Sequence, residues 1–223
     1  AMGGSDIEVQ EDVWAVQLAM ERQDFRAAHL LLENWTQGLL ANVGSAGSSL
    51  TQQQTEQLES SLVYYKRFNE RHADETKKLA LVVQSYSIAA RIQGILGHPE
   101  EALASNRQVF QLLEKPVTSI SVTDRHVFLG QAYFESARLH GSLNRRVQES
   151  AKYTVEEKDQ QKQTHQQQIG HFLTQAFAQG YFEMQVNLDR LKKDPHLVAF
   201  RSRAEFGKLL EPVSYTHLRA HET

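Results

Sequence analysis

The stretch YSIAARIQGILGHPEEALASNRQVFQLL, residues 86–113, decides the fold, because it combines two helix-forming segments with a break between them. On both sides of the break, apolar residues recur at steps of three and four, the period of an α-helix with one buried face. Gly97 can adopt the left-handed conformation that ends a helix, and Pro99 can begin the next one, because the donor it lacks would be unpaired there anyway. The stretch therefore predicts two helices joined as a hairpin.

The same helical periodicity covers most of the 223 residues, and runs of alternating Val, Ile or Thr that would indicate strands are absent from the sequence. We therefore expect an all-α protein whose folded domain spans residues 12–210. Within it we expect antiparallel hairpins at about 12–40, 51–115 and 123–180 and a C-terminal cap at 181–210.

Capping residues set the expected limits of two helices. Thr51 is expected to cap a helix that runs to about His72, and Thr123 or Asp124 is expected to cap the first helix of the third hairpin. Gly141 is expected to end that helix, because glycine is common just beyond helix ends.

The second helix of the third hairpin is expected to begin near Arg145. Residues 156–168, EEKDQQKQTHQQQ, contain no apolar residue and have no face that could pack. They form either an exposed helical bridge or a linker, and their Gln, Glu and Lys content favours the helix.

The two ends of the chain are expected to lie outside the folded domain. Residues 1–11 are expected to be disordered, and residues 211–223 continue no helical periodicity. Residues 214–223, SYTHLRAHET, resemble the translated tail of an assembly or adaptor artefact, so we expect this tail not to be native.

Composition limits the classes of partner. The net charge of −3, from 24 Lys and Arg against 27 Asp and Glu, gives no basic field for nucleic acid. No apolar run approaches the roughly 20 residues that span a bilayer, and no signal peptide is evident at the N-terminus. Because the sequence has no cysteine, a reducing, cytoplasmic setting is expected. We expect no membrane segment and no cofactor.

The hairpin at residues 86–113 resembles a tetratricopeptide repeat, in which small residues let paired helices approach closely. The residues that match its pattern are Tyr86, Ala89, Ala90, Gly97, Pro99 and Ala102. A second copy follows 133 − 86 = 47 residues later, at Tyr133, Ser136, Ala137 and Tyr153. The resemblance implies a stack of helical hairpins, an α-solenoid, that binds a protein or peptide partner.

Residues 64–115 and 172–210 resemble, more narrowly, the repeat regions attached to bacterial eukaryotic-like serine/threonine protein kinases. The matching C-terminal motif consists of Gly180, Tyr181, Asp194, Pro195, Leu197, Arg201, Phe206, Leu209 and Leu210. This resemblance implies that the chain is the regulatory or partner-binding portion of a larger signalling protein such as a serine/threonine kinase. A stand-alone helical adaptor is the alternative.

We expect no catalytic activity from this segment. It lacks the glycine-rich loop, strand lysine, His-Arg-Asp and Asp-Phe-Gly motifs of a kinase. An unrecognised helical enzyme stays open as an alternative, and it would need convergent titratable groups in a pocket.

The histidines do not predict a metal site. His217 and His221 have the spacing of helical zinc ligands, but no third ligand is evident and they lie in the suspect tail. His165 and His171 are expected at the solvated surface, and His140 is expected to be a hydrogen-bonded packing residue.

Four polar residues are the candidate partner-binding positions. If the two copies align, Arg91 corresponds to Arg138 and Gln84 corresponds to Gln131 on successive inner helices. Equivalent inner-helix positions line one surface of a helical solenoid, where two guanidiniums could hold a carboxylate or a phosphate of the partner. The alternative is that both arginines are solvated or paired with nearby glutamates.

Overall fold

A computed structural model describes residues 50–114 and 119–210. The chain divides into two compact units, Ala1–Tyr65 and Lys66–Thr223. Every regular element within the described ranges is an α-helix or a 3-10 helix, which confirms the expected all-α class for this part of the chain. The expected disordered end at 1–11, the hairpin at 12–40 and the tail at 211–223 lie outside the described residues.

Of the first unit, the structure describes residues 50–65, which contain the beginning of helix α3 (Gln52–His72). The Thr51 hydroxyl accepts a hydrogen bond from the Gln54 amide at 3.2 Å, and the Gln54 side chain accepts one from the Thr51 amide at 2.9 Å. This reciprocal capping satisfies two backbone donors of the first turn. The predicted cap at Thr51 and the predicted end at His72 are both confirmed.

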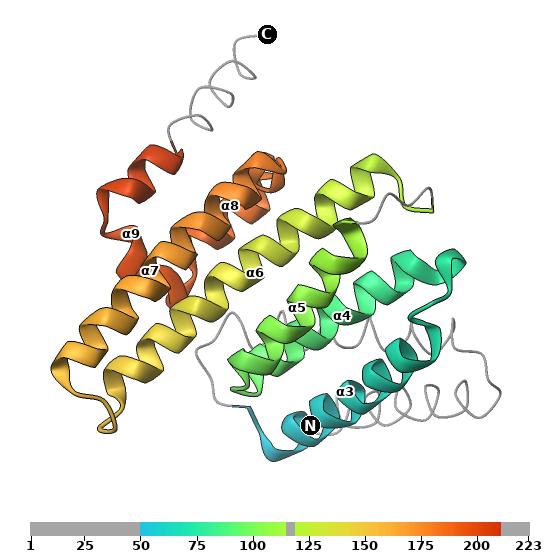
Figure 1. The fold of residues 1–223 in the computed structure, drawn as a ribbon, viewed down its shortest axis with the longest axis horizontal. Helices are drawn as coiled ribbons and strands as arrows, with labels where there is room; N and C mark the ends of the chain where they lie inside the picture. Colours follow the sequence, from blue (N-terminus) through green and yellow to red (C-terminus); the bar gives the residue numbers. More distant parts are fainter. Residues whose placement is uncertain (1–49, 115–118, 211–223) are drawn as a thin grey trace, which may run out of the picture. The chain divides into compact units, whose positions relative to one another are not determined.

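The second unit contains the rest of α3 and a series of helices in chain order (Figure 1). They are η1 (Thr76–Lys78), α4 (Leu79–Ile95), α5 (Pro99–Glu114), α6 (Val122–Glu149), α7 (Val155–Ala178), η2 (Tyr181–Glu183), α8 (Gln185–Lys193), η3 (Pro195–Leu197), α9 (Val198–Arg201) and a helical segment at 204–210. In the described ranges, no helix is both long enough and apolar enough to cross a membrane.

The first hairpin of this unit consists of α4 and α5, which pack against each other. Gly97 has a φ of +82° and α5 begins at Pro99, so the predicted break is confirmed with its mechanism. Ala90 and Ala102 are buried in one cluster with Leu139 of α6. Short side chains therefore lie where three helices meet, which permits their close approach.

The second hairpin of this unit, which corresponds to the third hairpin expected from the sequence, consists of α6 and α7. Here the predicted limits of the helices are wrong. Helix α6 continues through Gly141 to Glu149, and its N-cap is Ser121, whose hydroxyl accepts from the Asp124 amide at 3.0 Å. A Cβ atom at Gly141 would lie 2.1 Å from the carbonyl oxygen of His196. Glycine is present at this position because η3 passes close by, and not because the helix ends there.

The partner helix α7 begins at Val155, ten residues after the expected Arg145. Its N-terminus has a capping box of Thr154 and Glu157, and residues 156–168 are helical, as their composition favoured. Tyr153 lies in the connection before α7. The 47-residue register therefore does not extend to the second helix, because α6 is longer than the repeat pattern requires.

Helix α6 packs against both helices of the preceding hairpin as well as against α7. Figure 1 shows α5 lying between α4 and α6, with α7 and α8 beyond α6. The C-terminal elements η2 and η3 pack on α6, and α9 packs on α7. The core between them consists of buried residues such as Phe134, Leu173, Phe182, Leu191 and Leu197.

Candidate functional site

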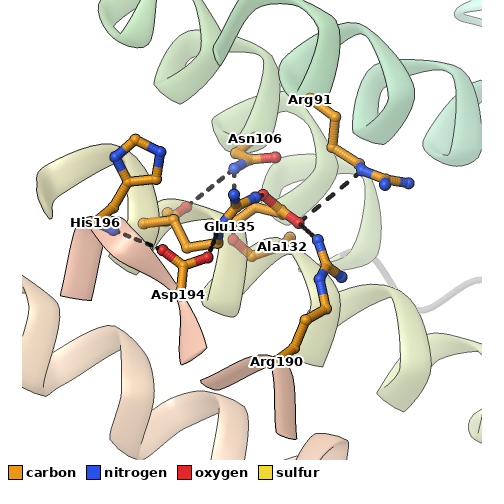
Figure 2. Close-up of polar contacts among 9 residues, drawn as sticks. Arg91, Asn106, Ala132, Glu135, Arg190, Asp194 and His196 are labelled. Carbon is orange, nitrogen blue, oxygen red and sulfur yellow. Dashed lines mark hydrogen bonds and ion pairs between the residues drawn. The ribbon is translucent and has the colours of Figure 1, made fainter. Parts of the chain in front are cut away.

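Three arginines from different helices converge on one glutamate, Glu135 of α6 (Figure 2). Arg138 Nη1 lies 2.6 Å from Glu135 Oε2, and Arg190 Nη2 lies 3.0 Å from Glu135 Oε1. Arg91 Nε lies 4.0 Å from the same Oε1. Together with Asp194, we call these residues the arginine cluster.

Asp194 is the second carboxylate of the cluster. It accepts a hydrogen bond from Arg138 Nε, and its Oδ1 accepts one from the backbone amide of His196 at 2.9 Å. The side chains of Glu135 and Asp194 are only 6% and 4% exposed. Since removing such charges from water is costly unless they are paired, these contacts are what allow both carboxylates to be buried.

Helix α5 is tied to α6 beside the arginine cluster. The Asn106 side-chain amide donates to the Ser136 hydroxyl at 3.2 Å and to the Ala132 carbonyl at 3.4 Å (Figure 2). Asn106 is buried, so it needs such partners. Asn106 therefore links α5 to α6 by hydrogen bonds across the helix pair.

The contacts within the cluster shift the pKa values of Glu135 and Arg138. Burial by itself raises the pKa of Glu135, but Arg138, Arg190 and Arg91 outweigh it and lower the pKa from 4.5 to about 2. Burial by itself lowers the pKa of Arg138, but Glu135 and Asp194 outweigh it and the pKa is raised. Glu135 and Arg138 are therefore both ionised at neutral pH, and Glu135 is no proton donor there.

The cluster contains more guanidiniums than carboxylates, because three arginines face Glu135 and Asp194. The side chain of Arg190 is 37% exposed, whereas that of Arg91 is 13% exposed. The arrangement therefore fixes α8 and η3 to α6 and presents a positive group at its exposed side, which suits an anionic group of a partner.

The predicted partner-binding residues lie on two helices. Gln84 and Arg91 are on α4, Gln131 and Arg138 are on α6, and all four are half-buried. Within each helix the two residues are seven positions apart and share a face. We call these four residues the Gln–Arg face.

The structure brings Arg91 and Arg138 together at Glu135, and Arg138 forms the glutamate pair that was the alternative interpretation. Sequence reasoning missed Glu135 and Arg190. Glu135 precedes Arg138 by three residues, a spacing at which helical side chains meet, so a local signal existed. Nothing in the sequence places Arg190 beside α6.

The predicted packing residues lie at the helix contacts. Ala89, Ala90, Ala102, Ser136 and Ala137 are at most 2% exposed. Tyr86 and Tyr133 are half-buried beside the core clusters, and the Tyr133 ring stacks on Phe110 with a centroid distance of 4.7 Å.

The residues of the C-terminal motif have structural roles. Gly180 ends α7 with a φ of +73°, and Tyr181 fits against Gly130, where a Cβ atom would lie 2.7 Å from the Tyr181 Cβ. Arg201 Nη1 donates to the Asp194 carbonyl at 2.7 Å. These residues of the motif therefore help to hold η2, η3 and α9 against α6 and α7.

The histidines are placed differently from the expectation. His140 is hydrogen-bonded, as expected, but its partner is His165, with the two Nδ1 atoms 3.0 Å apart. His165 is half-buried, whereas His171 is exposed. Burial, followed by His165 and Arg107, lowers the pKa of His140 to about 4. His217 and His221 lie outside the described residues.

No group of three or more His, Cys, Asp or Glu side chains within 50–114 and 119–210 is arranged to hold a metal ion. Comparison with known proteins adds no further identification: no family model, no curated protein and no solved structure matches the chain.

Proposed function

We propose that this chain is a protein-interaction scaffold of tetratricopeptide-like hairpins, and that a peptide or protein segment binds along its Gln–Arg face. The observation that carries the proposal is the stacking of α6 against both helices of the preceding hairpin. Stacked hairpins expose equivalent faces of successive helices side by side, and such faces form extended binding surfaces.

The chemistry of the Gln–Arg face favours a partner with an acidic group. The arginine cluster contains three guanidiniums, and the side chains of Gln84 and Gln131 are amides, a group that can donate to and accept from an extended backbone. Buried Glu135 already neutralises part of this charge, so the partner's anion would complement the cluster without replacing Glu135.

The test is a selection of binders from a random peptide library displayed on phage, with immobilised protein as the target. Affinities of the enriched peptides are then measured for the wild type and a Gln84→Ala, Gln131→Ala double variant. The matched control is Gln108→Ala, Gln111→Ala, which removes two exposed glutamines from α5.

We expect the Gln–Arg face variant to bind at least about tenfold more weakly, a loss of about 1.4 kcal/mol, and the α5 variant to bind like the wild type. A library that yields no specific peptide, or peptides that respond only to the α5 variant, would contradict the proposal.

We further propose that the scaffold is the regulatory or partner-binding portion of a larger signalling protein such as a bacterial serine/threonine kinase, with no catalytic activity in this segment. The support is the resemblance of residues 64–115 and 172–210 to kinase-attached repeats. Sequencing the gene upstream of the Ala1 codon tests this. A kinase domain in frame supports the proposal, whereas an open reading frame that starts at Met2, with no kinase domain before it, contradicts it in favour of a stand-alone adaptor.

A further inference from the structure

The second hairpin contains a pair of imidazoles that the proposed scaffold function does not use. His140 of α6 and His165 of α7 face each other across the helix contact, with ring centroids 5.3 Å apart. Their Nδ1 atoms lie 3.0 Å apart. A neutral imidazole has one N–H and one lone pair, so one ring donates to the other in this arrangement.

The ring of His140 is held in place. It stacks on Phe172 of α7 with a centroid distance of 5.5 Å and an interplanar angle of 24°. Both histidines are half-buried, so part of each residue is in contact with the protein and part is accessible to solvent. A preorganised pair of this kind loses little conformational freedom when it binds a ligand.

The spacing of the two nitrogens suits a metal ion. Zinc–imidazole bonds are about 2.0–2.1 Å long, and two such bonds at a tetrahedral angle place the nitrogens about 3.3 Å apart. The observed distance between the two Nδ1 atoms is 3.0 Å, so the rings would have to move apart by only a few tenths of an ångström. The proton of the donating ring moves to its Nε2 atom, which leaves a lone pair on both Nδ1 atoms.

A third donor lies one helical turn away. Asn144 is four residues beyond His140, so both side chains lie on the same face of α6. Asn144 is 7% exposed, and its Oδ1 atom is buried without a hydrogen-bond partner. A buried carbonyl oxygen without a protein partner is costly, so this atom would gain from a ligand beside it.

We propose that His140 and His165 form a two-imidazole site for a late first-row divalent metal ion. Imidazole nitrogen suits Cu²⁺, Ni²⁺ and Zn²⁺, and the general order of affinities places Cu²⁺ first. The bound ion links α6 to α7 and leaves its remaining positions to water or to the oxygen of Asn144.

The test uses the full chain without a histidine tag, freed of metal by a chelator that is then removed. Cu²⁺ is titrated at pH 7.5 by calorimetry, and the electron paramagnetic resonance spectrum reports the number of coordinating nitrogens. The variants are His140→Phe, which keeps an aromatic ring against Phe172, and His165→Gln. The matched control is His171→Gln, which removes an exposed histidine of α7 six residues from His165.

The wild type is expected to bind one Cu²⁺ ion at the His140–His165 pair, with a higher affinity than any other histidine of the chain has for the ion. The spectrum of this bound ion should show two coordinating nitrogens. Each pair variant is expected to lose at least about tenfold in affinity, and His171→Gln is expected to lose none. Circular dichroism establishes that each variant is folded.

Equal affinity in the wild type and in folded His165→Gln would overturn the site, because the imidazoles would then form only a hydrogen bond. Loss in one pair variant alone would overturn it too, since binding would then involve a single imidazole.

Discussion

The substitution Glu135→Gln tests the arginine cluster most sharply, because it keeps the size of the side chain and removes its charge. The fall in the pKa of Glu135 from 4.5 to about 2 corresponds to about 3 kcal/mol, since each tenfold change in proton affinity is worth about 1.4 kcal/mol. Breaking a buried ion pair by removing one partner costs about 3–5 kcal/mol in other proteins, which agrees. We expect Glu135→Gln to lower the free energy of unfolding by about 3 kcal/mol at pH 7.

Urea denaturation at pH 7 measures this loss, and a thermal scan should show a melting point lower by roughly 6–12 °C. The matched control is Glu205→Gln. Glu205 forms an ion pair with Arg203 at 2.8 Å, and its pKa is also lowered to about 2, chiefly by its hydrogen bond to Arg203. Glu205 is exposed, however, so solvent screens the pair and its loss should matter much less. Equal destabilisation by both variants would refute the reasoning, because burial would then make no difference.

The pH dependence gives the same test a second readout. The pKa of Glu135 is lower in the folded state, so its stabilising effect is complete above pH 4.5 and is lost as the pH falls from 4.5 towards 2. The stability difference between the wild type and Glu135→Gln should therefore shrink by about half between pH 6 and pH 3. A difference that stays constant over this range would mean that Glu135 contributes through packing and not through its charge.

Two further pairs of substitutions test the helix contacts, with urea denaturation as the measurement. Gly141→Ala should lower the free energy of unfolding by about 1–3 kcal/mol, because its Cβ would lie 2.1 Å from the His196 carbonyl oxygen. The matched control is Gly207→Ala, whose Cβ would meet no atom within 4 Å, so this change should be neutral or stabilising. Ala102→Glu places a charge at a fully buried position and should cost several kcal/mol, whereas Ala104→Glu on the exposed side of α5 should change stability by less than about 0.5 kcal/mol. Equal stability within either pair would mean that the contact is absent in solution.

The part of the fold that could be predicted from sequence is the part that depends on local chemistry. The conformational freedom of Gly97, the ring of Pro99 and the hydroxyl of Thr51 act within one helical turn, and the structure has each boundary where it was expected. The helix at 156–168 was favoured by composition alone, and α7 includes it.

The predictions that were wrong and the residues that were missed have a common physical cause. In each case the decisive contact joins residues that are distant in the sequence. Gly141 has the features of a helix end, but its role depends on η3, fifty-five residues later, whose carbonyl passes where a Cβ would be. The arginine cluster is similar, because Glu135 of α6 is stabilised by Arg190 of α8. The expected 47-residue spacing predicts that Arg91 and Arg138 correspond, but the position of Glu135 between them is evident only in the packed structure.

We proposed that a partner segment binds along the Gln–Arg face of α4 and α6. The most direct measurement is photo-crosslinking of a selected peptide that carries a reactive group at its centre, followed by mass spectrometry of the adducts. We expect the adducts on α4 between residues 84 and 91 and on α6 between residues 131 and 138. Adducts confined to α5 and α7 would place the partner elsewhere and contradict the account.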